Sequence, residues 1–284
     1  MTCICLCASF TAKGQANLHL ADSLFHTGEF SDTGLAYAYA EYQSENGDTL
    51  VIARIGQVKC YQQTGQYSDA CRVIDQTSPF GITDSLAAIV IYESMLSHYL
   101  AGEPETSVSR YQQARRILET SILHRESLLI LTLSYLDSQN WPLAHATGLT
   151  LLSSTAGLPF SSSSLLSKWS AFFDPNSLPR MRNPKTAQWL SAFFPGMGQI
   201  YAGYTGSGIL NFSIHAGTLA LAAIGFINGY YLTAWLAGLG IFQKFYYGGI
   251  RRAEELCQIK NRQELEKYLL PVKSFLVNQA EQFI

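Results

Sequence analysis

The residue types that could do chemistry are present, but their spacing assembles no catalytic site. Six histidines and six cysteines occur in the chain, without an H-E-x-x-H or comparable metal-binding spacing and without a G-x-S-x-G elbow. The glycine-rich stretch 196–208 lacks the Gly-Lys-Ser/Thr of a phosphate-binding loop, so close helix packing or a broken membrane helix is the better interpretation. We therefore predict a protein that is not an enzyme and that uses no metal and no cofactor.

Two polar residues on one face of an apolar helix are the other place where chemistry could occur. Asn211 and His215 are four residues apart, so in a helix they share a face. At membrane depth a polar side chain that faces lipid has no partner, so this face should turn toward residues 187–204 or 230–248. Two interpretations remain open. The pair forms hydrogen bonds that fasten helices together, or it is a polar site that moves or senses something within the membrane.

The segment that carries this pair has the composition of a membrane region. No Asp, Glu, Lys or Arg occurs from residue 186 to 243, and charged residues are only 14% of the chain, against about 25% in soluble proteins. Residues 207–228 and 230–248 are each long enough to cross a bilayer. The first piece, 187–204, is broken at Pro195-Gly196 and is expected to be either re-entrant or a short crossing.

The strongest internal signal is a period of 37 residues in the N-terminal half. Four turns have their second residue at positions 28, 65, 102 and 139. The residues two positions later are Phe30, Tyr67, Pro104 and Trp141, and small residues follow at Thr33, Ala70, Ser107 and Ala144. Glycine at the second position ends a helix by tolerating a left-handed conformation. We predict stacked helical hairpins in which the aromatic residues are buried at equivalent places and the small residues allow close helix approach.

This pattern resembles tetratricopeptide repeats, whose unit is usually 34 residues, over residues 17–154. The resemblance implies an all-α solenoid with a concave groove lined by the first helix of each hairpin. The family's groove positions fall on Asp22, His26, Lys59, Gln62, Gln63, Tyr92 and Tyr99. These residues are either solvated helix faces or contacts for a protein or peptide partner. The family's clamp for a C-terminal carboxylate needs several Lys, Arg and Asn residues, of which only Lys59 is present.

The broken apolar segment carries a second resemblance. Residues 194–203 read F-P-G-M-G-Q-I-Y-A-G and are followed by Gly206-x-Gly208. This stretch resembles the glycine-aromatic turn of TM2-domain proteins. It is more similar to a group of bacterial proteins that join a repeat domain to a P-G-x-G-Q-x-Y-x-G segment. The charged turn residues of the TM2 type are absent, and the bacterial group has no established activity. The resemblance therefore implies an architecture and no chemistry.

The two ends of the chain make conflicting predictions about topology. Residues 1–16 resemble the later part of a secretory signal peptide, although no Lys or Arg precedes their apolar stretch. Export would place the repeats outside the cytoplasm, in a bacterial cell envelope. Basic residues lie on both sides of the apolar run, at 180–185 and 251–252, and the positive-inside rule favours the cytoplasm for both. Three crossings, slightly favoured over two, would satisfy the rule for 251–252 only.

These signals predict a membrane-anchored, non-enzymatic scaffold. Its parts would be a signal peptide (1–16), a repeat domain (17–154), a linker (155–185), a membrane region (186–250) and a helical tail (251–284). The expected partners are a protein or peptide in the groove and the lipid bilayer. Nucleic acid is not expected, because a net charge of −2 offers no basic excess. The alternative is a subunit of a membrane transport or membrane-protein assembly system. Cys60 and Cys71 are expected to be free thiols, although export would allow a disulfide.

Overall fold

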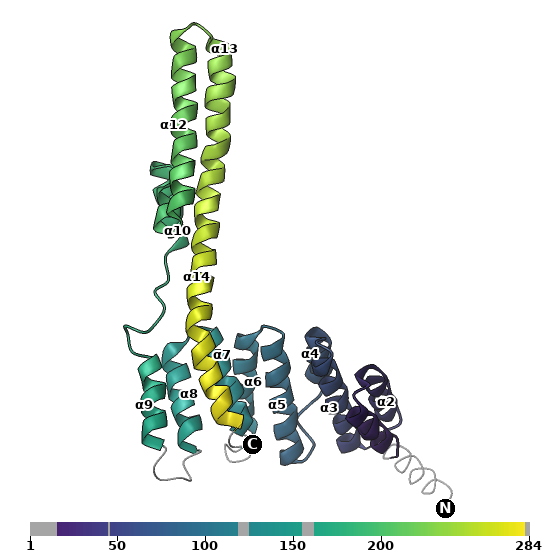
Figure 1. Cartoon of the computed structure of the whole chain (residues 1–284). Coiled ribbons are helices and arrows are strands. Elements are labelled where there is room, and N and C mark those ends of the chain that lie inside the picture. The colour runs from purple at the N-terminus through teal and green to yellow at the C-terminus, as the bar shows by residue number, and fades with distance from the viewer. Residues whose placement is uncertain (1–15, 45, 119–124, 155–161, 282–284) are drawn as a thin grey trace, which may run out of the picture. The chain divides into compact units, whose positions relative to one another are not determined.

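The computed structural model describes residues 16–44, 46–118, 125–154 and 162–281, and they contain helices and no strands, so the all-α prediction is confirmed. The predicted signal peptide lies outside the described residues, apart from residue 16. The chain divides into two compact units (Figure 1). The N-terminal unit comprises Met1–Asp174 together with Leu276–Ile284, and the C-terminal unit is Pro175–Phe275.

The N-terminal unit is a row of helices in which each packs on the next. After a helical stretch at residues 16–27 come α2 (Phe30–Tyr42), α3 (Gly47–Gln63), α4 (Tyr67–Asp75), α5 (Asp84–Leu100), α6 (Pro104–Ile117), α7 (Arg125–Asp137), α8 (Trp141–Ser154) and α9 (Ser162–Phe172). The helix α5 also packs on α3 and on α7 (Figure 1). Alternate helices therefore form one continuous layer, which is the layer that the predicted groove requires.

The 37-residue period of the sequence is also a period of backbone conformation. Gly28, Gly65, Gly102 and Gln139 have φ values of 83°, 73°, 80° and 56°. At the last three turns the following residue donates its N–H to the carbonyl five residues back, over 2.8–2.9 Å. This bond is part of the Schellman motif, which ends a helix with a left-handed residue. Gln139 adopts the glycine conformation because the same turn recurs there.

The small residues after each turn are fully buried, whereas the aromatic residues are buried only in part. Thr33, Ala70, Ser107 and Ala144 are all 0% exposed. Phe30, Tyr67 and Trp141 are only partly buried, so the predicted burial of these three rings is reached only in part. Each aromatic is the first residue of its helix and lies at the end of a hairpin, where neighbouring helices cover only part of the ring.

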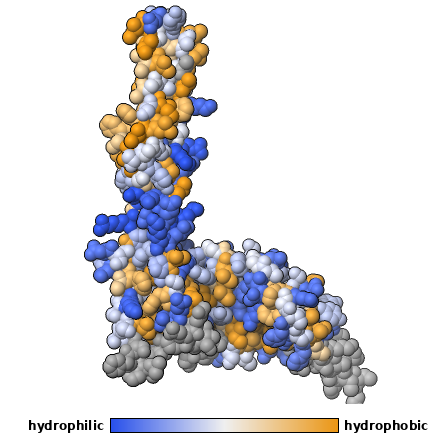
Figure 2. Space-filling model, in the orientation of Figure 1, coloured by the Kyte–Doolittle hydropathy of each residue, from blue (hydrophilic) through white to orange (hydrophobic). Residues whose placement is uncertain are grey.

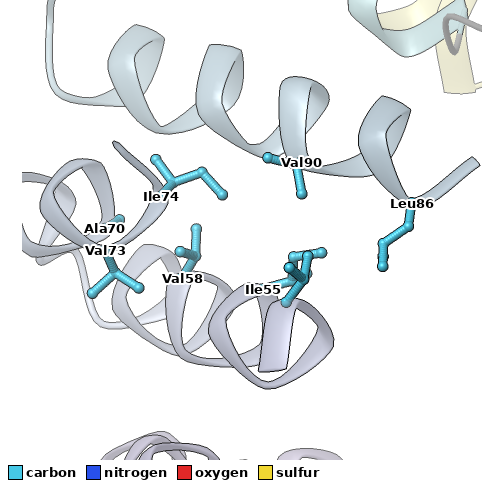
Figure 3. Packing of buried hydrophobic residues seen from close by; sticks show 8 residues of the cluster. Ile55, Val58, Ala70, Val73, Ile74, Leu86 and Val90 are labelled. Atoms are coloured by element: carbon cyan, nitrogen blue, oxygen red, sulfur yellow. The ribbon is translucent and has the colours of Figure 1, made fainter. Parts of the chain in front are cut away.

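Aliphatic side chains fill the space between successive helices. Val58 of α3, Ile74 of α4 and Val90 of α5 point toward one another in one such cluster (Figure 3). Closer packing occurs where a glycine faces an aromatic ring. A Cβ on Gly56 would overlap the ring of Tyr37, so this ring of α2 packs directly on the backbone of α3.

The predicted linker contains a helix. Residues 155–185 have the serine-rich composition of a linker, yet α9 forms at Ser162–Phe172 and packs on α8. Trp169 is 0% exposed, donates its indole N–H to the carbonyl of His145 at 3.0 Å, and covers Gly148. This one aromatic anchor turns a polar segment into part of the N-terminal unit. The connection between the units is therefore shorter than predicted.

The C-terminal unit contains α10 (Pro184–Phe193), α11 (Met197–Tyr201), α12 (Thr205–Ile227), α13 (Tyr231–Thr233), a π-helical turn η1 (Ala234–Gly240) and, as far as Phe275, α14 (Ile241–Glu281). Of the described helices, α12 is the one that is long and apolar enough to cross a membrane. Hydrophobic residues cover much of its surface in Figure 2. The predicted second span at 230–248 is not a separate helix. It continues without a break into α14, past the predicted start of the tail at 251.

The chain reverses direction within residues 187–204. A Cβ on Gly198 of α11 would overlap the carbonyl oxygen of Ala187 in α10, so the two short helices lie against each other. Gly196, with φ of 91°, makes the bend and packs on the backbone of Gly208. At about 1.5 Å per residue, the ten residues of α10 are about half as long as a bilayer core is thick. The segment folds back on itself and packs on Ala253, Leu256 and Cys257 of α14.

Two sets of contacts hold the C-terminal unit together. Near its start, Arg182 donates its N–H to Asn261 at 2.8 Å and accepts from the same amide at 2.7 Å, which fixes residue 182 beside α14. Along the hairpin, α12 packs on η1 through small residues. Cβ atoms on Gly225 and Gly238 would press on Ala234 and overlap Ala222, respectively. Such small-residue contacts are typical of helices that pack within membranes.

Candidate functional site

Two of the predicted groove residues converge on a buried carboxylate. Lys59 and Gln62 lie on α3, and Glu93 lies on the neighbouring α5 with 3% of its surface exposed. The amide of Gln62 donates to a carboxylate oxygen of Glu93 and to the hydroxyl of Ser97, each at 3.0 Å. The ammonium of Lys59 lies 3.7 Å from the other carboxylate oxygen. These contacts join α3 to α5, which are neighbours in the layer that would line the predicted groove.

Burial dominates the electrostatics of this cluster. It raises the pKa of Glu93 above its ordinary value, and the contacts with Gln62 and Lys59 offset only part of that effect. The pKa of Tyr92 is also raised, by burial first and then by the nearby carboxylates of Glu93 and Glu126. Lys59 is thus already paired, and its charge is directed at Glu93.

The other predicted groove residues do not form one cluster. Asp22 accepts a 2.6 Å hydrogen bond from Tyr37 of α2, so it contributes to the packing of its own hairpin. His26 and Gln63 are exposed, and Tyr92 and Tyr99 are partly buried. The structure therefore brings Lys59 and Gln62 together at Glu93, the residue after Tyr92 in the chain. It leaves His26 and Gln63 as solvated positions on the first helices.

Glu93 and Ser97 were missed by sequence reasoning, although one signal was present. Glu93 interrupts the apolar run I-V-I-Y-E-S-M-L as an isolated acidic residue. A lone carboxylate in such a run is buried with the rest of the helix and needs hydrogen-bond donors there. The donor, Gln62, lies on α3, two helices before α5 in the chain. The spacing of the two residues along the sequence therefore does not identify them as partners.

A second network, centred on the buried ring of His98, joins α5 to its neighbours in the chain. The ring of His98 is 4% exposed, and its nitrogens lie 2.9 Å from Glu103 and 3.1 Å from Asp75. Asp75 also accepts from Arg110 at 2.5 Å. Each ring nitrogen of His98 therefore faces one carboxylate. The network connects α4, α5 and α6, and its contacts are those of a structural clamp.

Glu93→Gln is expected to stabilise α5 at neutral pH and to have no effect below about pH 4. Because burial raises the pKa of Glu93, the folded chain holds that proton more tightly than the unfolded chain does. Stability is therefore lost as pH rises from the ordinary value of about 4.3 to the raised one. Glutamine removes the ionisation and still accepts a hydrogen bond from Gln62.

Amide hydrogen exchange of α5 in the full chain, compared with the wild type at each pH, measures this effect. Slower exchange is expected in the variant at pH 7, and equal exchange at pH 4. Glu105→Gln, at an exposed residue in the first turn of α6, is the control and should show no such stabilisation. Faster exchange in Glu93→Gln at pH 7 would contradict the raised pKa of Glu93.

The polar pair of the apolar helix is buried within the C-terminal unit. Asn211 is 8% exposed and His215 is 2% exposed. The His215 ring meets Phe242 and Tyr246 of α14 at centroid distances of 5.1 and 6.4 Å. Its Nδ1 bonds the Asn211 carbonyl at 2.7 Å, whereas His215 Nε2 and Asn211 Nδ2 make no hydrogen bond among the described residues. The pair therefore faces α14, with two polar atoms left over.

The thiols of the described residues are not paired. Cys60 and Cys71 are free, as expected, and burial raises the pKa of each to about 11. The acidic neighbours Glu103 and Asp75 add to the effect at Cys71. Both thiols are therefore held in their protonated form at neutral pH, which makes them poor nucleophiles.

Comparisons of the chain with protein-family models, with curated proteins and with solved structures found no match.

Proposed function

We propose that this chain is a membrane-anchored, non-enzymatic scaffold whose tetratricopeptide-like helical solenoid binds a protein or peptide. The observation that carries the proposal is the left-handed turn at positions 28, 65, 102 and 139, one in each unit of the period. Hairpins that repeat in this way stack and present a face longer than any single hairpin. The layer of α3, α5 and α7 supplies that face.

The anchor in this proposal is a helical hairpin made of α12 and the helix that follows it. The apolar surface of α12, the small residues opposite Ala222 and the uncharged run 186–243 support membrane insertion. Residues 187–204 fold back on themselves and pack on Ala253, Leu256 and Cys257 of α14, so they supply no separate crossing and we propose two crossings in place of three. The hydrogen bonds between Arg182 and Asn261 then hold both basic flanks on one side of the bilayer.

The side that these flanks occupy depends on the N-terminal residues. A signal peptide at 1–16 would place the repeats, both basic flanks and the tail outside the cytoplasm, in a cell envelope. The positive-inside rule would place all of them inside. We retain the external orientation, because long exported domains translocate largely regardless of their charge.

One observation favours the alternative function, a subunit of a membrane transport or membrane-protein assembly system. Asn211 Nδ2 and His215 Nε2 are buried between apolar helices without a hydrogen-bond partner. Polar groups left unsatisfied at membrane depth are unfavourable and commonly mark a functional position. In this alternative the repeats regulate, and the membrane helices carry out the function.

A photocrosslinker placed in the groove tests the scaffold. We expect p-benzoylphenylalanine at Gln63, an exposed position of α3, to form an adduct with a specific protein in native membranes. The same crosslinker at Gln112, which is exposed on α6 in the other layer, is the matched control and should form none. Adducts are resolved by gel mobility and identified by mass spectrometry. Adducts of equal yield at both positions, or none at Gln63 in a folded chain, would reject groove binding.

A further inference from the structure

A basic hollow lies at the end of the apolar part of the C-terminal unit. Its volume is about 410 Å³, and it is bounded by α11, α12 and the first turns of α14. The residues that line it are Gln199, Ser207, Leu210, Asn211, Ile214, Lys244, Phe245, Gly248, Gly249 and Arg252. The lining combines two cations, several hydrogen-bonding groups and three apolar side chains.

Glycines create this hollow between the two cations. Lys244, Gly248 and Arg252 are each four residues apart, so they follow one another along one face of α14. An added Cβ at Gly248 would meet nothing within 4 Å, so the space over this glycine is open. The two cations are separated by about 12 Å along the helix. A group of headgroup size fits between them.

The charges of the hollow are largely uncompensated. Lys244 makes no ion pair or hydrogen bond among the described residues. Arg252 donates to Glu255 through Nη1 only, at 3.2 Å, which leaves the rest of its guanidinium available. At the wall, the buried Asn211 Nδ2 is a donor without an acceptor. Two cations and an unsatisfied donor are the groups that an anionic oxygen ligand requires.

We propose that this hollow binds the phosphate of an anionic glycerophospholipid, an inference that rests on the membrane insertion of the proposed function. Lys244 is the first charged residue after the uncharged run, which is where lipid phosphates lie. Leu210 and Phe245 line the hollow and are 63% and 44% exposed, so they can contact acyl chains. Free phosphate would use the cations but not this apolar wall.

The test is lipid retention by the full chain, measured by native mass spectrometry. The chain is reconstituted in nanodiscs of phosphatidylcholine with 20% phosphatidylglycerol, and then released into detergent. We expect the wild type to retain phosphatidylglycerol in preference to phosphatidylcholine. Lys244→Gln and Arg252→Gln should each reduce that preference about tenfold or more, because a hydrogen bond between charged groups is lost. Arg251→Gln removes the same charge one residue away, outside the hollow, and should retain the preference.

A second variant tests the open space of the hollow independently of its two charges. Gly248→Leu fills the open space while Lys244 and Arg252 remain, so the preference for phosphatidylglycerol should be lost with the basic charge unchanged. Equal losses in Arg251→Gln and Arg252→Gln would show a general basic surface and overturn the proposal. Inorganic phosphate that displaces the retained lipid at millimolar concentration would assign the hollow to free phosphate.

Failure of membrane insertion is distinguishable from failure of this inference. Extraction of the chain from membranes by carbonate, together with its failure to enter nanodiscs, would reject the anchor and the lipid site together. A chain that inserts stably but retains phosphatidylcholine as well as phosphatidylglycerol would reject the lipid site alone.

Discussion

Replacing Gly198 by alanine is expected to destabilise the C-terminal unit, whereas the same replacement at Gly206 should be neutral or stabilising. A Cβ at Gly198 would overlap the backbone carbonyl of Ala187 and approach the hydroxyl of Ser191, which already accepts the Gly198 N–H at 3.1 Å. Backbone cannot rotate away as a side chain can, so α10 and α11 must separate. Overpacking of this kind costs about 1–3 kcal/mol, occasionally more.

The control is a glycine in the neighbouring helix. Gly206 lies in the first turn of α12, is exposed, and would place a Cβ in open space. Alanine there should gain about 0.5–1 kcal/mol of helix stability. Thermal unfolding of the full chain in detergent, with hydrogen exchange of residues 184–201 as the local measure, separates the two outcomes. Equal stability of Gly198→Ala and Gly206→Ala would show that α10 and α11 do not pack in this way.

The same geometry explains why the glycine-rich motif is a packing motif. Gly196 and Gly203 have φ values of 91° and 93°, which disfavour a side chain, and Gly198 touches backbone. The hydroxyl of Tyr201 accepts the N–H of Asn183, and the amide oxygen of Gln199 accepts from Ser207. Each of these residues is used to fold the segment back on itself. The close-packing interpretation of the stretch therefore agrees with its contacts.

The repeating part of the fold was accessible from the sequence because its signals are local. A left-handed turn and a small buried residue each depend on a few neighbouring positions. Equal spacing then located the fourth turn at Gln139, where no glycine marks it. The same reasoning overestimated the burial of Tyr67 and Trp141, because burial depends on how far a neighbouring helix extends over the ring.

The errors in the linker and in the second span share a physical cause. Composition gives the average polarity of a segment, whereas a helix can be stabilised by packing only one of its faces against a neighbour. Trp169 supplies that face in a serine-rich stretch, so α9 was read as linker. At Arg251 the polarity changes but the backbone hydrogen bonds do not, so α14 continues through the predicted boundary. Changes in charge marked the proposed membrane interface and did not mark the ends of helices.

The sequence identified some residues of each candidate site but missed the residues that they contact. Lys59 and Gln62 were placed on the groove layer, but the group that they contact, Glu93, became visible only in the packed structure. Similarly, Asn211 and His215 were identified, whereas Arg252 was considered only as part of a basic flank and Lys244 was not singled out. In both cases the missing residue lies on a different helix, and helix-to-helix register is not encoded in the spacing along one helix.

Single-cysteine labelling is expected to place residues 63 and 263 on one side of the membrane and residue 228 on the other. In the proposed hairpin, α12 crosses once, the turn at Asn228 lies beyond the far surface, and the following helix returns. The contact between Arg182 and Asn261 keeps the start and the end of the C-terminal unit together. In this proposal residues 187–204 supply no crossing of their own, because they reverse on themselves.

The experiment uses a chain without its native cysteines and one new cysteine at Gln63, Asn228 or Gln263, all of which are exposed. A membrane-impermeant maleimide is applied to sealed vesicles of each orientation and again after permeabilisation. Labelling should be nearly all or none, because the reagent does not cross the bilayer. Opposite sides for 63 and 263 would restore three crossings. The same side for all three positions would place the hairpin on the membrane surface instead of through it. If 63 and 263 are labelled together from outside intact cells, the exported orientation is supported, and from inside it is rejected while the hairpin stands.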